Sequence, residues 1–147
     1  MKLSLKTLLA AMTLPVLMTA CSSNGDNAQQ ITAQDLQHHN WELTSIDGQD
    51  LVLDGRNKAP RLEIGENMMA NGNAGCNNFF GQSELQNNQL RIEKMGMTMK
   101  MCIGNAMDIE KAVAQTLSDW SDITLTEQTL TLKNATHTLT FKNSDWK

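Results

Sequence analysis

Residues 123–141 read ITLTEQTLTLKNATHTLTF, and they alternate apolar residues with threonine in three short runs. Because successive side chains of a β-strand point to opposite faces, this alternation predicts strands with one buried face and one solvated face. The runs cover 123–125, 130–132 and 139–141, and the polar residues between them are few enough for hairpin turns. The C-terminal part of the chain is therefore predicted to be an antiparallel meander.

The same period of two extends upstream from this stretch. Asp47-Gly48 and Asn87-Asn88 supply residues that tolerate the left-handed backbone of tight hairpin turns. The predicted strands are 41–46, 51–53, 61–64, 68–73, 81–85 and 89–93. Strands that follow one another this closely favour antiparallel pairing between neighbours.

One long helix is predicted between residues 105 and 120. Its apolar residues recur with the helical period and form a single stripe: Ile109, Val113, Leu117 and Trp120. Asn105 is a suitable N-cap, because its side chain can accept a hydrogen bond from the first turn. Closed sheet edges and a single covering helix give the predicted fold class, which is α+β, mainly antiparallel β, with a small barrel-like meander and one main helix inserted between strands.

A second, much shorter helix is predicted just before the first strand. Thr32 can cap it and Asp35 occupies the third helical position, where a carboxylate is favourable. Ile31 can pack against Leu36 across the first turn. This helical turn is predicted to end near His39.

The N-terminal residues have the pattern of an export signal. Lys2 and Lys6 precede an apolar run over 8–18 that is too short to span a bilayer. Small residues and then Cys21 follow, so the segment resembles a bacterial lipoprotein signal, in which Cys21 is acylated and becomes the first mature residue. Ser22 stands in place of the aspartate associated with inner-membrane retention, which favours an outer-membrane anchor facing the periplasm.

These signals divide the 147-residue chain into a lipoprotein signal peptide (1–20), a flexible tether (21–30) and one domain (31–147). Loss of the signal would remove two lysines and take the formal net charge from −4 to −6. The basic residues are scattered rather than clustered, which argues against a nucleic-acid partner.

The cysteines predict a disulfide. With Cys21 acylated, Cys76 and Cys102 remain as an even pair in an oxidising compartment, where thiols readily pair. Neither lies in a CxxC motif, which argues against a redox-catalytic pair. A structural bridge between Cys76 and Cys102 is therefore expected.

Four methionines recur at every second position, namely Met95, Met97, Met99 and Met101. One extended strand would place the four thioethers on one face, where they would fill the core. The alternative is a Cu(I) site, to which His38, His39 or His137 could add an imidazole. Leu90 and Ile92 have the opposite parity, so a bulge is predicted over 94–96, with Gly96 absorbing it.

Other polar residues carry weaker signals. No Ser-His-Asp set, phosphate loop or zinc motif occurs at usable spacing. Asn77 and Asn78 are expected to form a tight connection held by side-chain bonds to the backbone, with ligand recognition as the alternative. An enzyme site could assemble only from turns that are distant in sequence, such as those around Asn77 and His137.

Two segments, Gly75-Cys76-Asn77-Asn78-Phe79-Phe80-Gly81 and Met97-Thr98-Met99-Lys100-Met101-Cys102, resemble the paired signatures of the META domain family. The family motif corresponds to Gly75, Cys76, Asn77, Phe80, Gly81, Met97, Thr98, Met101 and Cys102. The chain departs from it at Lys100, where small residues are more usual. The resemblance implies an association with heat stress and with tolerance of novobiocin, and no established reaction.

Together these features predict a lipid-anchored protein of the cell envelope that acts in stress by binding an unknown envelope protein or small ligand. No catalytic residues, cofactor or metal are expected. The alternatives are a periplasmic copper-handling protein that uses the Met95–Met101 stripe and a hydrolase without a recognisable motif.

Overall fold

The computed structural model describes residues 29–145. In chain order the elements are α1 (Ala33–Leu36), β1 (His39–Ile46), β2 (Gln49–Asp50), β3 (Arg61–Ile64), the short 3-10 helix η1 (Glu66–Met68), β4 (Met69–Asn73), β5 (Asn78–Gln86), β6 (Gln89–Met97), α2 (Ala106–Ser118), β7 (Ser121–Leu125), β8 (Thr129–Lys133) and β9 (Thr138–Asn143). Within this part of the chain, no helix is both long enough and apolar enough to cross a membrane.

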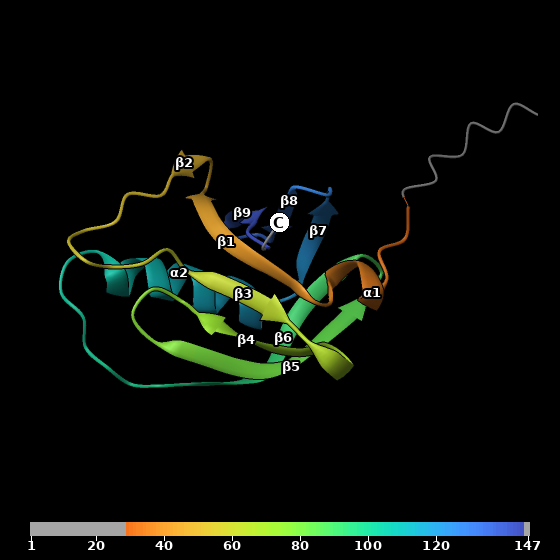
Figure 1. Ribbon diagram of the computed structural model, residues 1–147, viewed down its shortest axis with the longest axis horizontal. Coiled ribbons are helices and arrows are strands. Elements are labelled where there is room, and N and C mark those ends of the chain that lie inside the picture. The colour runs from red at the N-terminus through yellow and green to blue at the C-terminus, as the bar shows by residue number, and fades with distance from the viewer. Residues whose placement is uncertain (1–28, 146–147) are drawn as a thin grey trace, which may run out of the picture.

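The strands form one antiparallel sheet that closes on itself. From β3 onward each strand pairs with the next, and β1 pairs with both β3 and β9. The strand β2 pairs only with β1, so it extends the hairpin and the barrel proper has eight strands. Figure 1 shows β1 crossing the molecule between these partners. The predicted barrel-like meander is confirmed.

The core of the barrel is built by the alternation seen in the sequence. Leu130 and Leu132 of β8 are buried, as are Leu139 and Phe141 of the paired strand β9, while the threonines between them are more exposed. Burial of each large apolar side chain contributes about 1.5–3 kcal/mol. The three C-terminal strands are therefore confirmed in both position and facing.

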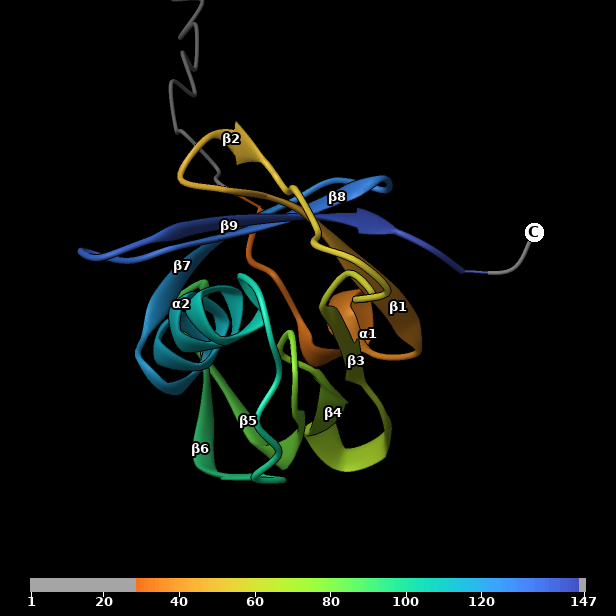
Figure 2. The ribbon, with the colours of Figure 1, turned by 90° about the vertical axis from the view of Figure 1, so that its left-hand side faces the viewer.

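The helix α2 packs where two neighbouring strands of the barrel share the fewest paired positions. Strands β6 and β7 share only two paired positions, Gln89 with Asp122 and Leu90 with Ser121. Beyond them the two strands diverge, and α2 packs against β6 and β9 with a buried face that includes Val113. Figure 2 looks nearly along α2 and shows β8 and β9 above it and β5 and β6 below it. The predicted stripe residues Ile109, Val113 and Leu117 therefore complete the core. The prediction is wrong for Trp120, because the helix ends at Ser118 and the Trp120 ring lies against Arg91 outside the core.

The prediction of a strand at residues 51–53 is wrong. Strand pairing after the Asp47-Gly48 turn ends at Asp50, and residues 51–60 form an irregular loop. The sheet position beside β1 is taken by β3, where Trp41 lies opposite Leu62. The loop segment therefore has no free strand edge beside β1.

The first helix is shorter than predicted, ending at Leu36 rather than near His39. Leu36 is fully buried, and the next residues reverse the chain: His38 has a φ of 65° and donates its N–H to the Ile64 carbonyl. His39 then begins β1. A buried anchor followed by a left-handed residue thus stops the helix early.

The predicted bulge in β6 is present, but a different residue absorbs it. The register between β5 and β6 shifts between Phe80 and Gln82, and Lys94 has a φ of 49°. Gly96 instead lies beneath the Phe80 ring, where a Cβ atom would come within 2.6 Å of the ring. The glycine therefore provides space for an aromatic side chain.

The methionine stripe is divided by the end of β6 at Met97. Met95 and Met97 are half-buried and pack against the core. Met99 and Met101 lie beyond the strand and are 97% and 87% exposed. The prediction of a single four-sulfur face, and with it the proposed basis of a Cu(I) site, is wrong because the chain leaves the sheet before the stripe is complete.

Candidate functional site

Asn77 joins three segments of the chain. Its side-chain amide donates to the Lys100 carbonyl at 3.0 Å, and its Oδ1 accepts from the Lys100 N–H at 2.6 Å and from Thr98 Oγ1 at 2.9 Å. The same amide donates to Glu110 Oε1 at 2.9 Å. Asn77 is buried, and the donors and acceptors of its side chain are satisfied by protein.

Glu110 of α2 is the acceptor at the centre of this cluster. Its Oε2 receives the backbone N–H groups of Cys76 at 3.0 Å and of Asn77 at 2.5 Å. The residue is 8% exposed, and the three hydrogen bonds that it receives from the 76–77 segment compensate for its lost hydration. Nothing in the sequence marks Glu110 as a buried residue, because a glutamate on an amphipathic helix is usually exposed.

The predicted disulfide lies beside these hydrogen bonds. Cys76 and Cys102 are bridged, with their Cα atoms 5.8 Å apart. The bridge attaches the irregular segment after β6 to the turn between β4 and β5. Disulfide, Asn77 and Glu110 therefore fix one junction between strands and helix.

Most residues of the family motif belong to this junction or support it. Gly75 has a φ of 142°, and a Cβ atom there would lie 2.8 Å from the Ala106 carbonyl oxygen at the start of α2. Only the backbone of Lys100 is engaged, which explains why the residue type can vary there. Met101 is the exception, since its side chain is exposed. Asn77 thus holds the connection by side-chain bonds to the backbone, as expected, and the Asn78 N–H is accepted by Thr98 Oγ1 beside it.

The suggested pairing of Asn77 with His137 is not the arrangement found. His137 Nδ1 lies 2.8 Å from Asp47 Oδ2, which links the β8–β9 turn to the β1–β2 turn. Asp47 Oδ1 also accepts the Thr138 N–H at 2.7 Å. His137 therefore stabilises a pair of turns at the edge of the core.

The two adjacent histidines also separate. His38 is exposed beside Glu66, whereas His39 Nδ1 lies 2.6 Å from Asp145 Oδ2. Across residues 29–145, no three or more His, Cys, Asp or Glu side chains gather where they could hold a metal ion. Cys21, the predicted lipidation site, lies outside the described residues.

Two of these carboxyl groups have pKa values below the ordinary range. For Asp47, the hydrogen bonds from His137 and from the Thr138 backbone lower the pKa. Burial acts to raise the pKa of Asp145, but the hydrogen bonds from His39 and the Asn40 backbone outweigh it and the pKa is lowered. Both groups therefore favour the folded state when they are ionised.

Asp47 gives a test of this coupling. Its folded pKa is lower than the unfolded value of about 3.9, so its contribution is present above that pH and is lost as the pH falls through the folded pKa. In urea unfolding, the advantage of the wild type over Asp47→Asn should shrink steadily between about pH 5 and pH 3. Asp50→Asn, an exposed change on β2, should show little difference at any pH. A pH-independent advantage over Asp47→Asn would contradict the assignment.

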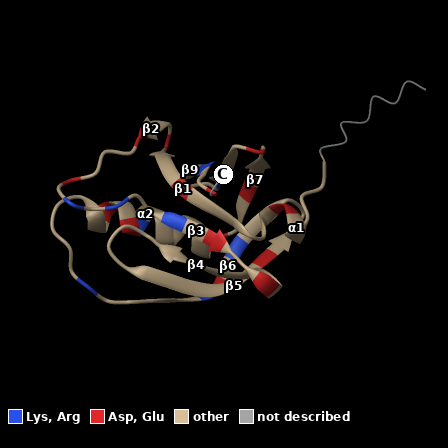
Figure 3. Cartoon of the chain, viewed as in Figure 1, with Lys and Arg blue, Asp and Glu red and all other residues tan. Residues whose placement is uncertain are grey.

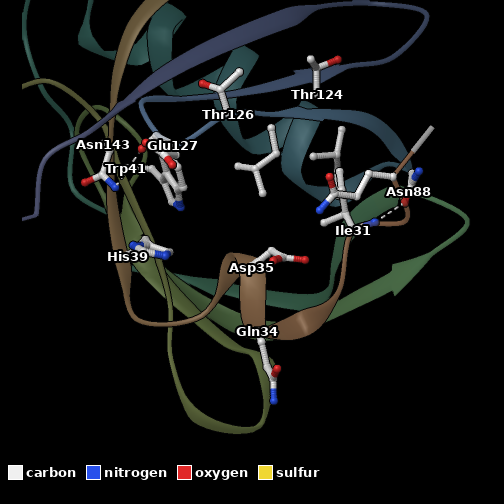
Figure 4. Close-up of a pocket in the computed structure, with 13 residues that line it drawn as sticks. Ile31, Gln34, Asp35, His39, Trp41, Asn88, Thr124, Thr126, Glu127 and Asn143 are labelled. Atoms are coloured by element: carbon white, nitrogen blue, oxygen red, sulfur yellow. Dashed lines mark hydrogen bonds between the residues drawn. The ribbon is translucent and has the colours of Figure 1, made fainter. Parts of the chain in front are cut away.

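A pocket of about 790 Å³ opens between α1 and β7. Figure 4 shows its lining, which comes from α1 and the segment before it, the start of β1, the β5–β6 turn, β7 with the turn that follows it, and the end of β9. Ile31 N–H donates to Asn88 Oδ1 at 2.8 Å along one border. Its volume lies within the range of small-molecule sites, about 300–1,000 Å³.

The charge of this pocket has one sign. Asp35 and Glu127 line it, and none of its thirteen lining residues is lysine or arginine. Figure 3 shows acidic positions on α1 and along β7. Hydrogen bonds from the side chain and backbone of Thr32 lower the pKa of Asp35, so it is ionised at neutral pH.

Trp41 contributes an unsatisfied donor to the same pocket. The residue is 1% exposed, and its Nε1 has no hydrogen-bond partner in the described structure. In Figure 4 the indole nitrogen points toward the side of the pocket bordered by His39 and Asp35. A buried donor without an acceptor costs about 1–3 kcal/mol of stability. A bound molecule that placed a hydrogen-bond acceptor at Nε1 would remove this cost.

Two sequence comparisons find proteins similar to this chain. The META domain profile matches residues 34–146. Heat shock protein HslJ of Escherichia coli (strain K12) is 33% identical over 142 residues, which cover 96% of this chain and 98% of that protein.

Two solved structures have the same fold. An NMR structure with 32% sequence identity superposes with a TM-score of 0.69, covering 79% of this chain and 97% of its own. A second NMR structure, of a protein from Burkholderia xenovorans, is 24% identical with a TM-score of 0.63, covering 78% and 87%.

Proposed function

This chain belongs to the META domain family, and on that premise we propose that it is a lipid-anchored envelope protein that protects the cell under heat stress by non-covalent binding. The supporting observation is the match to a heat shock protein over nearly the full length of both chains. The anchor is Cys21, held in the outer membrane and facing the periplasm, and residues 22–30 separate it from the domain.

The geometry supports binding rather than catalysis. Asn77 and Glu110 are committed to holding the backbone, and the histidines at positions 39 and 137 are each paired with an aspartate. The pocket beside α1 offers volume, an unmet donor and charge without a nucleophile and base at hydrogen-bond distance. The associated phenotype is tolerance of heat and of a bulky antibiotic such as novobiocin.

The function is tested by deleting the gene and complementing it. The deletion strain should grow normally without stress and lose tolerance of heat and novobiocin. A gene encoding the wild-type chain should restore tolerance, and His137→Gln should restore it equally. Loss of complementation by His137→Gln at normal abundance and thermal stability would instead indicate a catalytic or metal site.

The anchor has its own test. Cys21→Ala should move the protein from the membrane fraction to the soluble fraction and remove the mass of the acyl groups, because a single replaced atom abolishes the attachment point. Ser22→Ala leaves the cysteine in place and is the matched control. A Cys21→Ala chain that stays in the membrane with unchanged mature mass would exclude lipidation at this position.

A further inference from the structure

We infer that the pocket between α1 and β7 binds a small organic cation, a protonated amine on an apolar body that also carries a hydrogen-bond acceptor for Trp41. This inference rests on the proposed binding function and specifies the chemical class of the ligand. Three independent properties of the lining define that class: an unmet donor, a single sign of charge and an apolar wall.

The donor is the indole N–H of Trp41. The whole side chain is buried, Nε1 has no hydrogen-bond partner in the described structure, and Figure 4 shows the nitrogen pointing toward the pocket. An ether, hydroxyl or carbonyl oxygen of a bound molecule would satisfy it. A purely hydrocarbon ligand would leave it unpaired.

The sign of charge selects a cation. Asp35 and Glu127 reach the pocket from sequence positions far apart, and no lysine or arginine among the lining residues neutralises them, while the His39 ring is paired with Asp145. Both hydrogen bonds from Thr32 go to Asp35 Oδ2, so Oδ1 remains available to an ammonium group. An anionic ligand would face two carboxylates without a compensating charge.

The His39 ring borders the pocket beside Trp41. Their centroids are 5.7 Å apart and the planes are inclined by 60°. Asp145 occupies His39 Nδ1, which orients the imidazole and leaves Nε2 as the ring nitrogen for a ligand. In a neutral imidazole whose Nδ1–H donates to Asp145, Nε2 is an acceptor that can receive a hydrogen bond from an ammonium group.

The remaining wall accounts for the apolar body. Ile31, Ile123 and Leu125 line the pocket opposite the polar groups. A ligand with a hydrocarbon or aromatic portion would remove their exposed surface from water. The arrangement therefore favours an amphipathic amine over a bare inorganic cation.

The experiment uses three probes with one aromatic skeleton: para-methoxyphenethylamine, para-methoxyphenethyl alcohol and para-methoxyphenylacetate. Each is titrated into the ¹⁵N-labelled full chain while the indole N–H resonances are followed, with that of Trp41 assigned from Trp41→Phe. The amine should shift the Trp41 resonance saturably and leave that of Trp120, which lies against Arg91 outside the pocket, unchanged. The alcohol should bind more weakly than the amine, and the acid should not bind.

Charge is tested separately by Glu127→Gln, since Glu127 is exposed and its side chain stabilises no neighbour in the described structure. This change should lower the affinity for the amine about threefold and leave the affinity for the alcohol unchanged. Asp50→Asn removes the same charge far from the pocket and should leave both affinities unaltered. Equal binding of amine and acid, or a Trp41 resonance that no probe moves at millimolar concentration, would overturn the inference.

These outcomes are separable from the proposed function. A chain that complements the deletion strain but binds no amine refutes only the ligand class. Amine binding by a chain that confers no stress tolerance refutes only the cellular role. Each result therefore decides one of the two proposals.

Discussion

Replacing Cys76 and Cys102 together with alanine should lower the free energy of unfolding by about 3.5 kcal/mol. The bridge closes a loop whose ends are 26 residues apart, and the estimate follows from the chain entropy that this closure removes from the unfolded state. A native state of this size has only about 5–15 kcal/mol of stability in total. The double variant should therefore remain folded at room temperature with a much lower urea midpoint.

Urea unfolding by circular dichroism measures this effect, with Cys21→Ser in both chains so that no third thiol interferes. The wild-type chain under a reducing agent should approach the midpoint of the double variant, because both lack the same cross-link. A loss below about 1 kcal/mol would show that the hydrogen bonds of Asn77 already hold the junction without the bridge.

Glu110→Ala should lower the free energy of unfolding by about 3–5 kcal/mol, the largest effect expected for a single substitution in this domain. Without the carboxylate, two backbone N–H groups and one amide N–H in a buried site have no acceptor, and each unpaired donor costs about 1–3 kcal/mol of stability. The substitution also leaves a cavity. Glu110→Gln should lose less stability, because the amide carbonyl oxygen can still accept a hydrogen bond. Its NH₂ group, however, would face N–H donors and could not accept from them.

The matched control is Lys111→Ala, an exposed change at the next position of the same helix, which should stay within about 0.5 kcal/mol of the wild type. Because Glu110 and the disulfide hold the same turn, their combined loss should differ from the sum of the separate losses. A Glu110→Ala chain as stable as Lys111→Ala would show that water replaces the carboxylate.

The sequence predicts most of this fold because the barrel alternates strictly. The period of two places β8 and β9 correctly, and the Asn87-Asn88 turn joins β5 to β6, with φ values of 50° and 58° at the two asparagines. The helix at 106–118 follows from its apolar stripe. Local patterns suffice wherever neighbours in sequence are also neighbours in the sheet.

Local patterns fail where a distant segment decides. Leu51 and Leu53 pack against the core from a loop, because β3 already occupies the position beside β1. Asn105 is the N-cap residue of α2 but does not cap it with its side chain, which donates instead to the Val52 carbonyl at 2.7 Å. Glu110 is buried because its carboxylate accepts the backbone N–H groups of residues 76–77. Those residues are more than thirty positions away in the sequence.

The pocket could not be predicted from the sequence for the same reason. Asp35 and Glu127 become neighbours of one cavity only after the barrel closes, and neither belongs to a motif. Trp41 begins a predicted strand, but whether its nitrogen has a hydrogen-bond partner depends on three-dimensional packing. The signal that could have marked the site is weak: the segments 29–41 and 121–127 contain no lysine or arginine.

The closure of the barrel through β1 has a consequence for how the chain is made. Bonds between β1 and the last segment join residues 96 to 106 positions apart. Although β1 can pair early with β2 and β3, its pairing with β9, which closes the barrel, needs almost the entire domain. Contacts of such long range slow folding. A chain secreted N-terminus first would therefore stay loose enough to keep threading until translocation ends. On the export route proposed above, this strand order would delay closure of the barrel until the chain reaches the compartment where its disulfide can form.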